Sequence, residues 1–311
     1  MTPTSDPRGL RAELETLTTE AFRPELADID RLPTAEIARL MNAEDTTVPA
    51  AVATALPRIA AAIDAVAARM ARGGRLVYAG AGTAGRLGVL DASECPPTFN
   101  TGPGQVVGLI AGGPEAMVTS VEGAEDSAEL ARADLDALKI GPDDTVVGVS
   151  ASGRTPYAIG AVAHARAAGA LTVGLSCNAG SPLAAAAEHG IEVVVGPELL
   201  TGSTRLKAGT AQKLVLNMIS TITMIRLGKT YGNLMVDVRA SNEKLRARSR
   251  RIVALATGAG DDEIERALTA TGGEVKPAIL VVLGGVDGPT AARLLEESGG
   301  LLRAALGAAA D

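Results

Sequence analysis

Apolar residues recur every three or four positions near the start of the chain. Between residues 49 and 72 they fall on one face of a helix, with Pro57 inside the series and two glycines directly after it. This spacing predicts a long helix that bends near Pro57 and ends at the glycines. Residues 35–41 carry a shorter series behind Thr34, which predicts a helix capped by that threonine.

Beyond residue 74 the pattern changes to short β-branched and aliphatic runs that alternate with alanine-rich stretches. The runs are continuous rather than alternating, which predicts strands buried on both faces. Such strands, with helical segments between them, are typical of a parallel sheet covered by helices, whose ligand sites lie beyond the carboxyl ends of the strands. The five candidate strands span residues 76–78, 106–110, 145–149, 171–175 and 191–195.

The last third of the chain returns to helical patterns. A series from residue 205 to 227 predicts a largely buried helix that Gly228 ends. Residues 231–239 are expected to be irregular, and another helix is expected to start at Ser241. The last fifty residues predict a small module of three short helices, around 262–268, 275–283 and 289–297. We therefore expect an N-terminal arm (1–48), an α/β domain (49–240) and a C-terminal helical module (241–311).

Composition narrows the classes of ligand. Of the 311 residues, 47% are hydrophobic and 21% are charged, which is typical of a globular α/β protein. The formal net charge is −7, so no overall positive field attracts a nucleic acid backbone. With 3 Tyr, 2 Phe and no Trp, the chain has few aromatic platforms for bases or sugars. A sugar ligand would therefore be held by hydrogen bonds.

The few cysteines and histidines form no metal-binding pattern. Cys95, Cys177, His164 and His189 lack the spacings that ligate zinc, and we expect both histidines to be structural. The first twenty residues carry four acidic side chains and no apolar core, and no apolar run approaches the roughly 18 residues that span a bilayer. We expect a soluble cytoplasmic protein with no metal and no membrane contact.

A glycine-rich turn follows the first candidate strand. Residues 80–85 read GAGTAG, between a strand and a predicted helix, where backbone amides can cradle an anion. The turn matches the GxGxxG pattern of dinucleotide folds, but Gly112 and Gly113 follow the second strand where such folds need an acidic residue. The alternative is that these glycines only permit a tight turn.

A second hydroxyl-rich turn follows the third candidate strand. Ser150, Ser152 and Thr155 precede Pro156, a residue favoured in the first turn of a helix. Hydroxyls and free amides at a helix start donate hydrogen bonds to a phosphate. A simple helix cap needs one hydroxyl, so three of them favour a phosphate site.

Two groups of acidic residues are candidates for proton transfer. Glu94 lies at the expected end of a helix, before Pro96 and Pro97, where the helix dipole would raise the pKa of its carboxyl as a general acid requires. The cluster of Glu122, Glu125 and Asp126 follows, and spacing alone does not choose among its members. Each of these acids has the alternative reading of a solvated surface side chain.

A third hydroxyl-rich helix start lies at residues 201–210. It carries Arg205 and Lys207 in the first turn, where the helix dipole opposes cations, so it calls for an anionic or carboxylate partner. Lys207 could equally be a surface residue, as could Lys213 and Lys229.

Longer runs of sequence resemble one known family. The match extends over nearly the whole chain, and the family is that of the N-acetylmuramic acid 6-phosphate etherases. The runs are GAGTAGRLGVLDASECPPTF, VEGAEDS, SASGRTPY, TGSTRLKAGTAQKLVLNMIST and GNLMVDV. The resemblance implies a sugar isomerase (SIS) domain, which is a three-layer α/β/α sandwich around a parallel sheet. It also implies a C-terminal module similar to the ubiquitin-associated three-helix fold, and a homodimer in the bacterial cytoplasm.

The reaction implied by the resemblance is cleavage of the lactyl ether of N-acetylmuramic acid 6-phosphate, without a cofactor, in cell-wall sugar recycling. The sugar opens, the C2 proton is removed, lactate leaves C3 and water adds back. By motif, Glu94 corresponds to the family's proton donor and Glu125 to its second catalytic acid. We expect Glu94 to protonate the lactate oxygen and later to activate water, and Glu125 to take the C2 proton.

The resemblance also implies the residues that bind the substrate. Ser150, Ser152, Thr155 and Thr83 are expected to hold the 6-phosphate, and further contacts are expected from Gly82, Gly85, Arg86, Ser203 and Lys207. Ala84 stands where the family usually has serine, so we expect one hydrogen bond to the phosphate to be missing.

Two other functions share parts of these motifs. A non-catalytic sugar-phosphate regulator is built on the same domain, but pure binding does not require Glu94 and Glu125. An aldose-ketose isomerase shares ring opening and C2 proton abstraction, and its product distinguishes it from an etherase.

Overall fold

The computed structural model describes residues 14, 16–238 and 243–310. The chain divides into two compact units, one formed by Met1–Ser93 and Val106–Ile219 and the other by Glu94–Gln105 and Ser220–Asp311. The first unit holds the sheet, and the second holds the C-terminal helices.

The sheet of the first unit is parallel and five-stranded. Its strand order is β2-β1-β3-β4-β5, and Gly80 at the end of β1 lies opposite Val149 at the end of β3. The ends of β1 and β3 are therefore level at one edge of the sheet. The strands are β1 (Leu76–Gly80), β2 (Val106–Ile110), β3 (Thr145–Val149), β4 (Leu171–Ser176) and β5 (His189–Glu192).

Four strands agree with the sequence prediction, and the fifth was predicted in part. β5 ends at Glu192 rather than at residue 195, and it also begins earlier, so His189 lies in a strand rather than at a helix end. Val193 and Val195 remain buried after the chain has left the sheet. The apolar run at residues 191–195 therefore indicates burial, and only its first part belongs to the strand.

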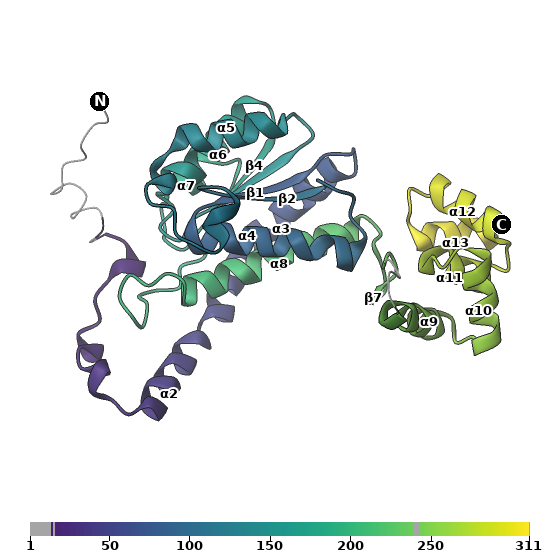
Figure 1. Ribbon diagram of the computed structural model, residues 1–311, viewed down its shortest axis with the longest axis horizontal. Helices are drawn as coiled ribbons and strands as arrows, with labels where there is room; N and C mark the ends of the chain where they lie inside the picture. Colours follow the sequence, from purple (N-terminus) through teal and green to yellow (C-terminus); the bar gives the residue numbers. More distant parts are fainter. Residues whose placement is uncertain (1–13, 15, 239–242, 311) are drawn as a thin grey trace. The chain divides into compact units, whose positions relative to one another are not determined.

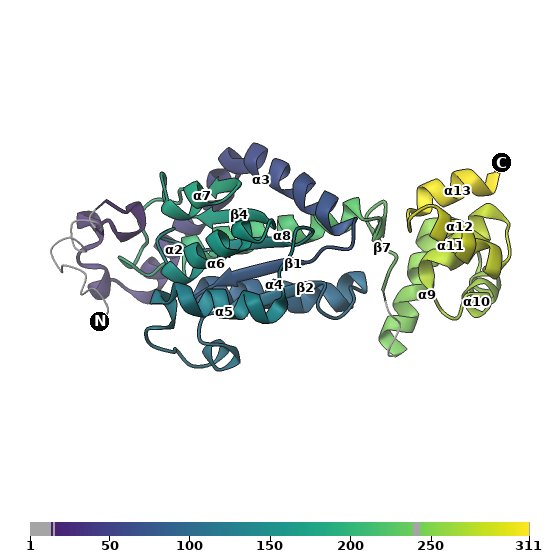
Figure 2. The ribbon, with the colours of Figure 1, turned by 90° about the horizontal axis from the view of Figure 1, so that it is seen from above.

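Helices cover both faces of the sheet (Figures 1 and 2). On one face, Val77 and Val146 pack in one cluster with Leu135 and Tyr157. On the other face, the Tyr78 hydroxyl donates a hydrogen bond to Asp91 at 2.7 Å. The first face carries α5 (Ala128–Leu138), α6 (Pro156–Ala167) and α7 (Pro182–Ala186), and the second carries α3 (Val48–Met70), α4 (Gly82–Phe99) and α8 (Lys207–Arg226). The predicted parallel sheet between helical layers is confirmed.

The prediction that a helix ends near Glu94, before the two prolines, is wrong. The helix continues through Pro96 and Pro97 to Phe99, and Asn100 closes it with a φ of 51°. Pro96 and Pro97 have no amide hydrogen, so the carbonyls of Ala92 and Ser93, four residues earlier, lose their helical donors. Glu94 is consequently not in the last turn of the helix, where the sequence analysis expected it.

Short helices form the N-terminal arm. These are η1 (Thr18–Glu20), η2 (Pro24–Leu26), η3 (Ile29–Arg31) and α2 (Thr34–Asp45). Thr34 is the first residue of α2 rather than its cap, because Pro33 occupies the cap position. Helix α3 follows and continues through Pro57, as predicted for that segment.

The stretch from Thr34 to Met70 is long and apolar enough, by length and composition, to cross a bilayer. Within it, Val52, Ile59 and Val66 of α3 are buried in the protein. Such burial is typical of a core helix in a globular domain.

The second unit is helical apart from a small hairpin. Residues 231–239 are less irregular than predicted, because β6 (Thr230–Tyr231) pairs antiparallel with β7 (Leu234–Met235). Ser241 lies outside the described residues, and the helix expected near it is described from Glu243. The helices are α9 (Glu243–Thr257), α10 (Asp261–Ala270), α11 (Val275–Gly284), α12 (Gly288–Glu297) and α13 (Leu302–Ala310).

Helix α13 was not predicted. Its sequence is mostly alanine and leucine, and alanine contributes little to an apolar period. Leu302 and Ala305 nevertheless lie in the core of the second unit with Val253, Ile279 and Leu280. Helix α13 therefore follows the three short helices that were predicted, and it is stabilised by packing against these residues rather than by a local sequence pattern.

Candidate functional site

A cleft of about 410 Å³ lies beyond the carboxyl ends of β1 and β3. These two strands are neighbours where the strand order changes direction, with β2 on one side and β4 on the other. In open parallel sheets this switch point is where ligands bind. The loops after both strands line the cleft, as the sequence predicted for the strand ends.

The turn after β3 forms a hydroxyl cradle, which we define as Ser150, Ser152 and Thr155. The Ser150 oxygen lies 2.7 Å from that of Thr155 and 3.3 Å from that of Ser152. It also accepts a hydrogen bond from the Gly153 amide at 3.0 Å. Gly153 has a φ of 70°, and a Cβ there would stand 2.4 Å from that of Ser181, so only glycine fits this turn. All three hydroxyls line the cleft at the start of α6.

The turn after β1 lines the cleft beside the hydroxyl cradle. Thr83, Ala84 and Gly82 are lining residues, whereas Gly85 is not. A Cβ on Gly85 would lie 2.6 Å from the Gly80 carbonyl oxygen. Gly85 therefore permits α4 to pack tightly against β1, which was the alternative reading of this glycine motif.

The structure separates the members of the acidic cluster. Glu125, in η5 (Ala124–Asp126), lines both the cleft and an adjoining side pocket of about 170 Å³. Asp126 lines only the cleft, and Glu122 lines only the side pocket. Glu125 is thus at the junction of the two spaces.

Arg86 lines the side pocket. Its Nε donates to the carbonyl oxygen of Met117 at 3.1 Å. Met117 ends η4 (Pro114–Met117), so this bond fixes the guanidinium against the loop that follows β2. Among the described residues, no ion pair to Arg86 is found, which leaves its terminal nitrogens available to a ligand.

Glu94 belongs to the second unit, whereas the residues that line the cleft belong to the first. Its side chain is exposed, and it lines neither the cleft nor the side pocket. It follows Thr83 by eleven residues on α4, which is about 16 Å along a helix.

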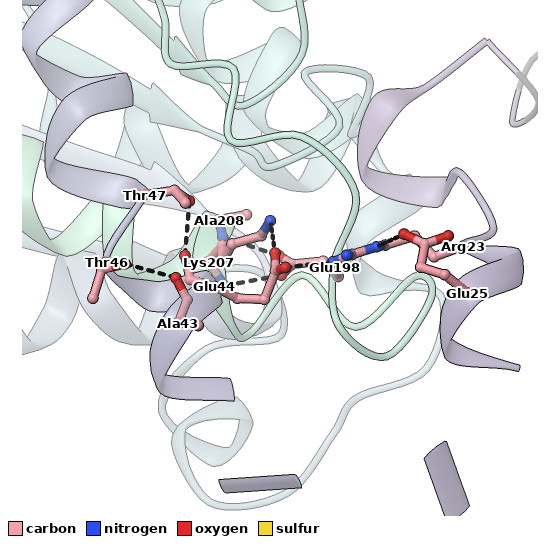
Figure 3. Close-up of polar contacts among 9 residues, drawn as sticks. All are labelled: Arg23, Glu25, Ala43, Glu44, Thr46, Thr47, Glu198, Lys207 and Ala208. Atoms are coloured by element: carbon pink, nitrogen blue, oxygen red, sulfur yellow. Dashed lines mark hydrogen bonds and ion pairs between the residues drawn. The ribbon is translucent and has the colours of Figure 1, made fainter. Parts of the chain in front are cut away.

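Lys207 also lies outside the cleft, although the resemblance implied a substrate contact. It is 4% exposed, and its ammonium donates to Glu44 at 2.6 Å (Figure 3). Glu198 accepts hydrogen bonds from the amides of Lys207 and Ala208, both at 3.0 Å. The carboxylate partner that this helix start called for is therefore confirmed, and it is provided by the protein itself.

Glu44 joins this helix start to the N-terminal arm. Arg23 lies 2.6 Å from its other oxygen. Burial alone would raise the pKa of Glu44, but the hydrogen bonds from Lys207 and Arg23 outweigh it and hold that pKa below its ordinary value. Lys207 thus fastens α8 to the arm. Ser203 is likewise not a lining residue, whereas Thr204 next to it is one.

Sequence reasoning missed two residues of the cleft wall, Glu20 and Gln212. Glu20 comes from the arm, which is tied to the domain because the backbone amide and hydroxyl of Thr18 donate to Asn178 at 2.8 and 2.9 Å. Its carboxylate lies against Gly202, where a Cβ would be 2.8 Å from it. No local signal marks Glu20, because only the fold brings the arm to the cleft.

Gln212 lies on α8 and is 1% exposed. Its Nε2 is buried, and within the described residues it has no hydrogen-bond partner. The sequence does not indicate this, because a single glutamine in a helix rich in alanine and leucine shows neither its burial nor its lack of a partner.

The described residues hold no group of three or more His, Cys, Asp or Glu side chains that could bind a metal. Cys177 is buried, which raises the pKa of its thiol to about 12. His164 contacts Asp136 at 2.7 Å on the surface of the first unit. The polar groups of the cleft are therefore hydroxyls, amides, carboxylates and the guanidinium of Arg154.

Comparison with known proteins identifies the family. Residues 124–222 match the SIS domain, and residues 58–166 match the N-terminal SIS domain of glucokinase regulatory protein. A protein of Streptomyces coelicolor named N-acetylmuramic acid 6-phosphate etherase is 84% identical over 99% of both chains. The chain belongs to the N-acetylmuramic acid 6-phosphate etherase family.

More distant etherases match along almost the whole chain as well. The etherase of Rubrobacter xylanophilus is 64% identical, covering 94% of this chain and 96% of its own. That of Cronobacter sakazakii is 58% identical, covering 94% and 99%. Among solved structures, a phosphoheptose isomerase from Francisella tularensis has a TM-score of 0.49 and 17% identity, covering 62% of this chain and 100% of that one.

These comparisons confirm the resemblance read from the motifs. The full-length relatives are named as etherases, which supports an enzyme rather than a regulator. The match to the regulatory protein is confined to one domain.

Proposed function

We propose that this etherase converts N-acetylmuramic acid 6-phosphate and water into N-acetylglucosamine 6-phosphate and D-lactate. The observation that carries the proposal is the full-length identity with etherases, together with a cleft at the switch point that joins a hydroxyl cradle to a carboxylate. The reaction takes place in the cytoplasm, in the recycling of cell-wall amino sugars, and the chain's own residues supply its acids and bases.

The 6-phosphate binds in the hydroxyl cradle, with Thr83 on the facing turn. Helices α4 and α6 both start at this point, and helix starts favour anions. The hydroxyls donate hydrogen bonds without adding positive charge. This site fixes one end of the sugar and directs C2 and C3 towards Glu125.

Glu125 takes the C2 proton of the opened sugar. The electron pair of the C2–H bond first forms a C1–C2 double bond, as the carbonyl electrons move to the C1 oxygen. It then shifts to form the C2–C3 double bond as the C3–O bond breaks, and the ether oxygen leaves with a proton from Glu94. Water adds to C3 of the unsaturated aldehyde, and a proton returns to C2. An ether oxygen is a poor leaving group, so its protonation is the step that most needs a positioned acid.

The lactyl group occupies the side pocket. At about 30 Å³ per water, a volume of about 170 Å³ holds five to six waters, comparable with the six non-hydrogen atoms of a lactyl group. Its carboxylate binds the terminal nitrogens of Arg86, whose planar fork suits a carboxylate. The ether oxygen is then held at the junction where Glu125 lies.

We propose that a second copy of the chain supplies Glu94, so that the enzyme acts as a homodimer. The support is the position of Glu94 on α4, exposed and about 16 Å along the helix from Thr83. The reacting carbons of a sugar phosphate lie much closer than this to its phosphate.

The C-terminal helices α10 to α12 correspond to the ubiquitin-associated-like module, and α13 is additional to it.

Mixing two inactive variants tests the shared site. A dimer of one Glu94→Gln chain and one Glu125→Gln chain has one cleft with both carboxylates intact if Glu94 acts across the interface. Lactate release should then return on mixing. If each chain uses its own Glu94, every cleft in the mixture is defective and no activity returns.

The reaction itself is tested in heavy-oxygen water. The purified protein should release D-lactate from N-acetylmuramic acid 6-phosphate and place the label on C3 of the sugar, and Glu94→Gln should abolish the release. Tight binding without lactate would instead indicate a regulator, and a ketose product would indicate an isomerase.

A further inference from the structure

The side chain of Gln212 has a buried donor that the folded protein leaves unused. It is 1% exposed, its Nε2 has no hydrogen-bond partner among the described residues, and it lines the cleft. A buried donor without a partner destabilises a fold, and most buried polar side-chain atoms have one. The polar atom that completes this hydrogen bond is therefore expected in the ligand.

Helix α8 sets where this donor lies. Three residues before Gln212, Gly209 is in contact with the turn after β1, because a Cβ there would stand 3.4 Å from the methyl group of Thr83. Residues three apart share a face of a helix. Gln212 thus lies on the face of α8 that meets the cleft, and Ala208 at the start of α8 is held by Glu198.

We propose that Nε2 of Gln212 donates a hydrogen bond to the C1 carbonyl oxygen of the opened sugar and stabilises the negative charge that develops there. This assignment rests on the proposed etherase reaction. When Glu125 takes the C2 proton, the electron pair of the C2–H bond forms a C1–C2 double bond, and the carbonyl electrons move to the oxygen. As the C3–O bond breaks, the oxygen electrons re-form the carbonyl, the C1–C2 pair becomes the C2–C3 double bond, and the C3–O pair leaves with the ether oxygen.

The chemistry of the cleft favours the C1 oxygen over the phosphate. The proposed phosphate position already has three hydroxyls and two helix starts to donate to it, whereas none of the roles assigned above gives the C1 oxygen a donor. A donor held in place before the reaction, at a site shielded from water, acts mainly on charge that appears in the transition state. Gln212 is such a donor, because its burial prevents water from competing for it.

The test replaces Gln212 with methionine, which has a similar length and no donor. We expect the kcat of D-lactate release to fall about 10²- to 10³-fold, with KM changed less than about threefold. Exchange of the C2 proton with deuterated solvent should fall in parallel. The Tm should stay the same or rise, because the variant no longer buries an unpaired amide.

Thr223→Val is the matched control. Thr223 is also on α8, its hydroxyl is also buried without a partner among the described residues, and it does not line the cleft. This variant should keep the wild-type kcat, KM and C2 exchange.

Three outcomes would overturn the assignment. A raised KM with unchanged kcat would mean that Gln212 binds a ground-state group such as the phosphate. A lowered Tm with normal exchange would mean a structural role, and normal kinetics would mean no role. If the wild-type protein itself releases no lactate, the proposed function fails, which is a separate result.

Discussion

The two units of this protein each contain a cleft, and the clefts differ in how their polar groups are paired. The cleft of the second unit measures about 770 Å³ and the cleft of the first about 410 Å³. In the larger cleft, Asp237 pairs with both Lys276 and Lys229 at 2.9 Å, and Arg250 pairs with Glu265. These ion pairs join helices and loops within the second unit.

In the smaller cleft, several polar side chains lack such partners among the residues that the structure describes. Glu20 and Glu125 form no ion pair within the described part of the chain, and Gln212 keeps its amide donor free of partners there. Gln212 therefore gives the smaller cleft a buried side-chain donor without a partner among the described residues, and no lining residue of the larger cleft has such a donor. The following experiments test this comparison, from the largest expected effect to the smallest.

Removing the carboxylate of Glu125 should have the largest effect. For Glu125→Gln we expect the kcat of lactate release to fall about 10²- to 10⁴-fold, because a general base is lost without a change of shape. Glu274→Gln alters a carboxyl of the larger cleft and should leave kcat unchanged. Equal losses in both variants would contradict the comparison.

The side pocket is tested by changing the enzyme and the substrate together. Arg86→Gln should lower kcat/KM for N-acetylmuramic acid 6-phosphate about 10- to 100-fold, the value of hydrogen bonds to a charged group. For the analogue whose lactyl carboxylate is a neutral amide, the same variant should differ little from wild type. The exposed Arg132 provides the control variant Arg132→Gln. A loss of equal size on both substrates would refute the lactyl assignment.

In the second unit, the expected effect is on stability rather than on activity. Lys276 is 8% exposed, and besides its bond to Asp237 it donates to the Gly300 carbonyl oxygen at 3.0 Å. Lys276→Met should lower the free energy of unfolding by about 2 kcal/mol, because it leaves two acceptors short of a donor. Urea unfolding measures this loss, and kcat per folded molecule should not change. A lower kcat at full folding would give this cleft a role in the reaction.

Removing a hydroxyl from the hydroxyl cradle should weaken substrate binding. Ser152→Ala removes a donor that lines the cleft, so KM should rise about tenfold or more with a smaller effect on kcat. Ser203→Ala removes a hydroxyl outside the cleft and should leave KM unchanged. A KM that rises equally in both variants would argue against the cradle as the phosphate site.

The smallest effect is expected from adding a hydroxyl. Ala84 is 7% exposed and lines the cleft beside Thr83. Ala84→Ser should lower KM a few-fold, because a new donor would face the phosphate. An unchanged or higher KM would show that residue 84 makes no contact with it.

Much of this architecture was predictable from local patterns. Continuous apolar runs marked four strands closely, and the hydroxyls of residues 150–155 pointed to the edge where the cleft lies. The failures have physical causes. Val193 and Val195 are buried after β5 has ended, α4 continues through its two prolines, and the alanines of α13 contribute little to an apolar period.

The site was predictable only where one loop carries it. Ser150, Ser152 and Thr155 are neighbours in sequence, so their convergence follows from a single turn. Choosing Glu125 from its cluster, or finding Glu20 and Gln212, required knowing which loops, arm and helix meet. Spacing along the chain contains no such information.

The sequence by itself therefore determined four strands, the hydroxyl-rich turns and the family, because each depends on residues close together or on motifs read in order. Only the tertiary structure decided which polar groups are used up and which remain available. Lys207 is neutralised by Glu44, 163 residues away, while the amide donor of Gln212 is left without a partner among the described residues. Both outcomes depend on burial and on partners distant in the chain, and these exist only once the chain has folded.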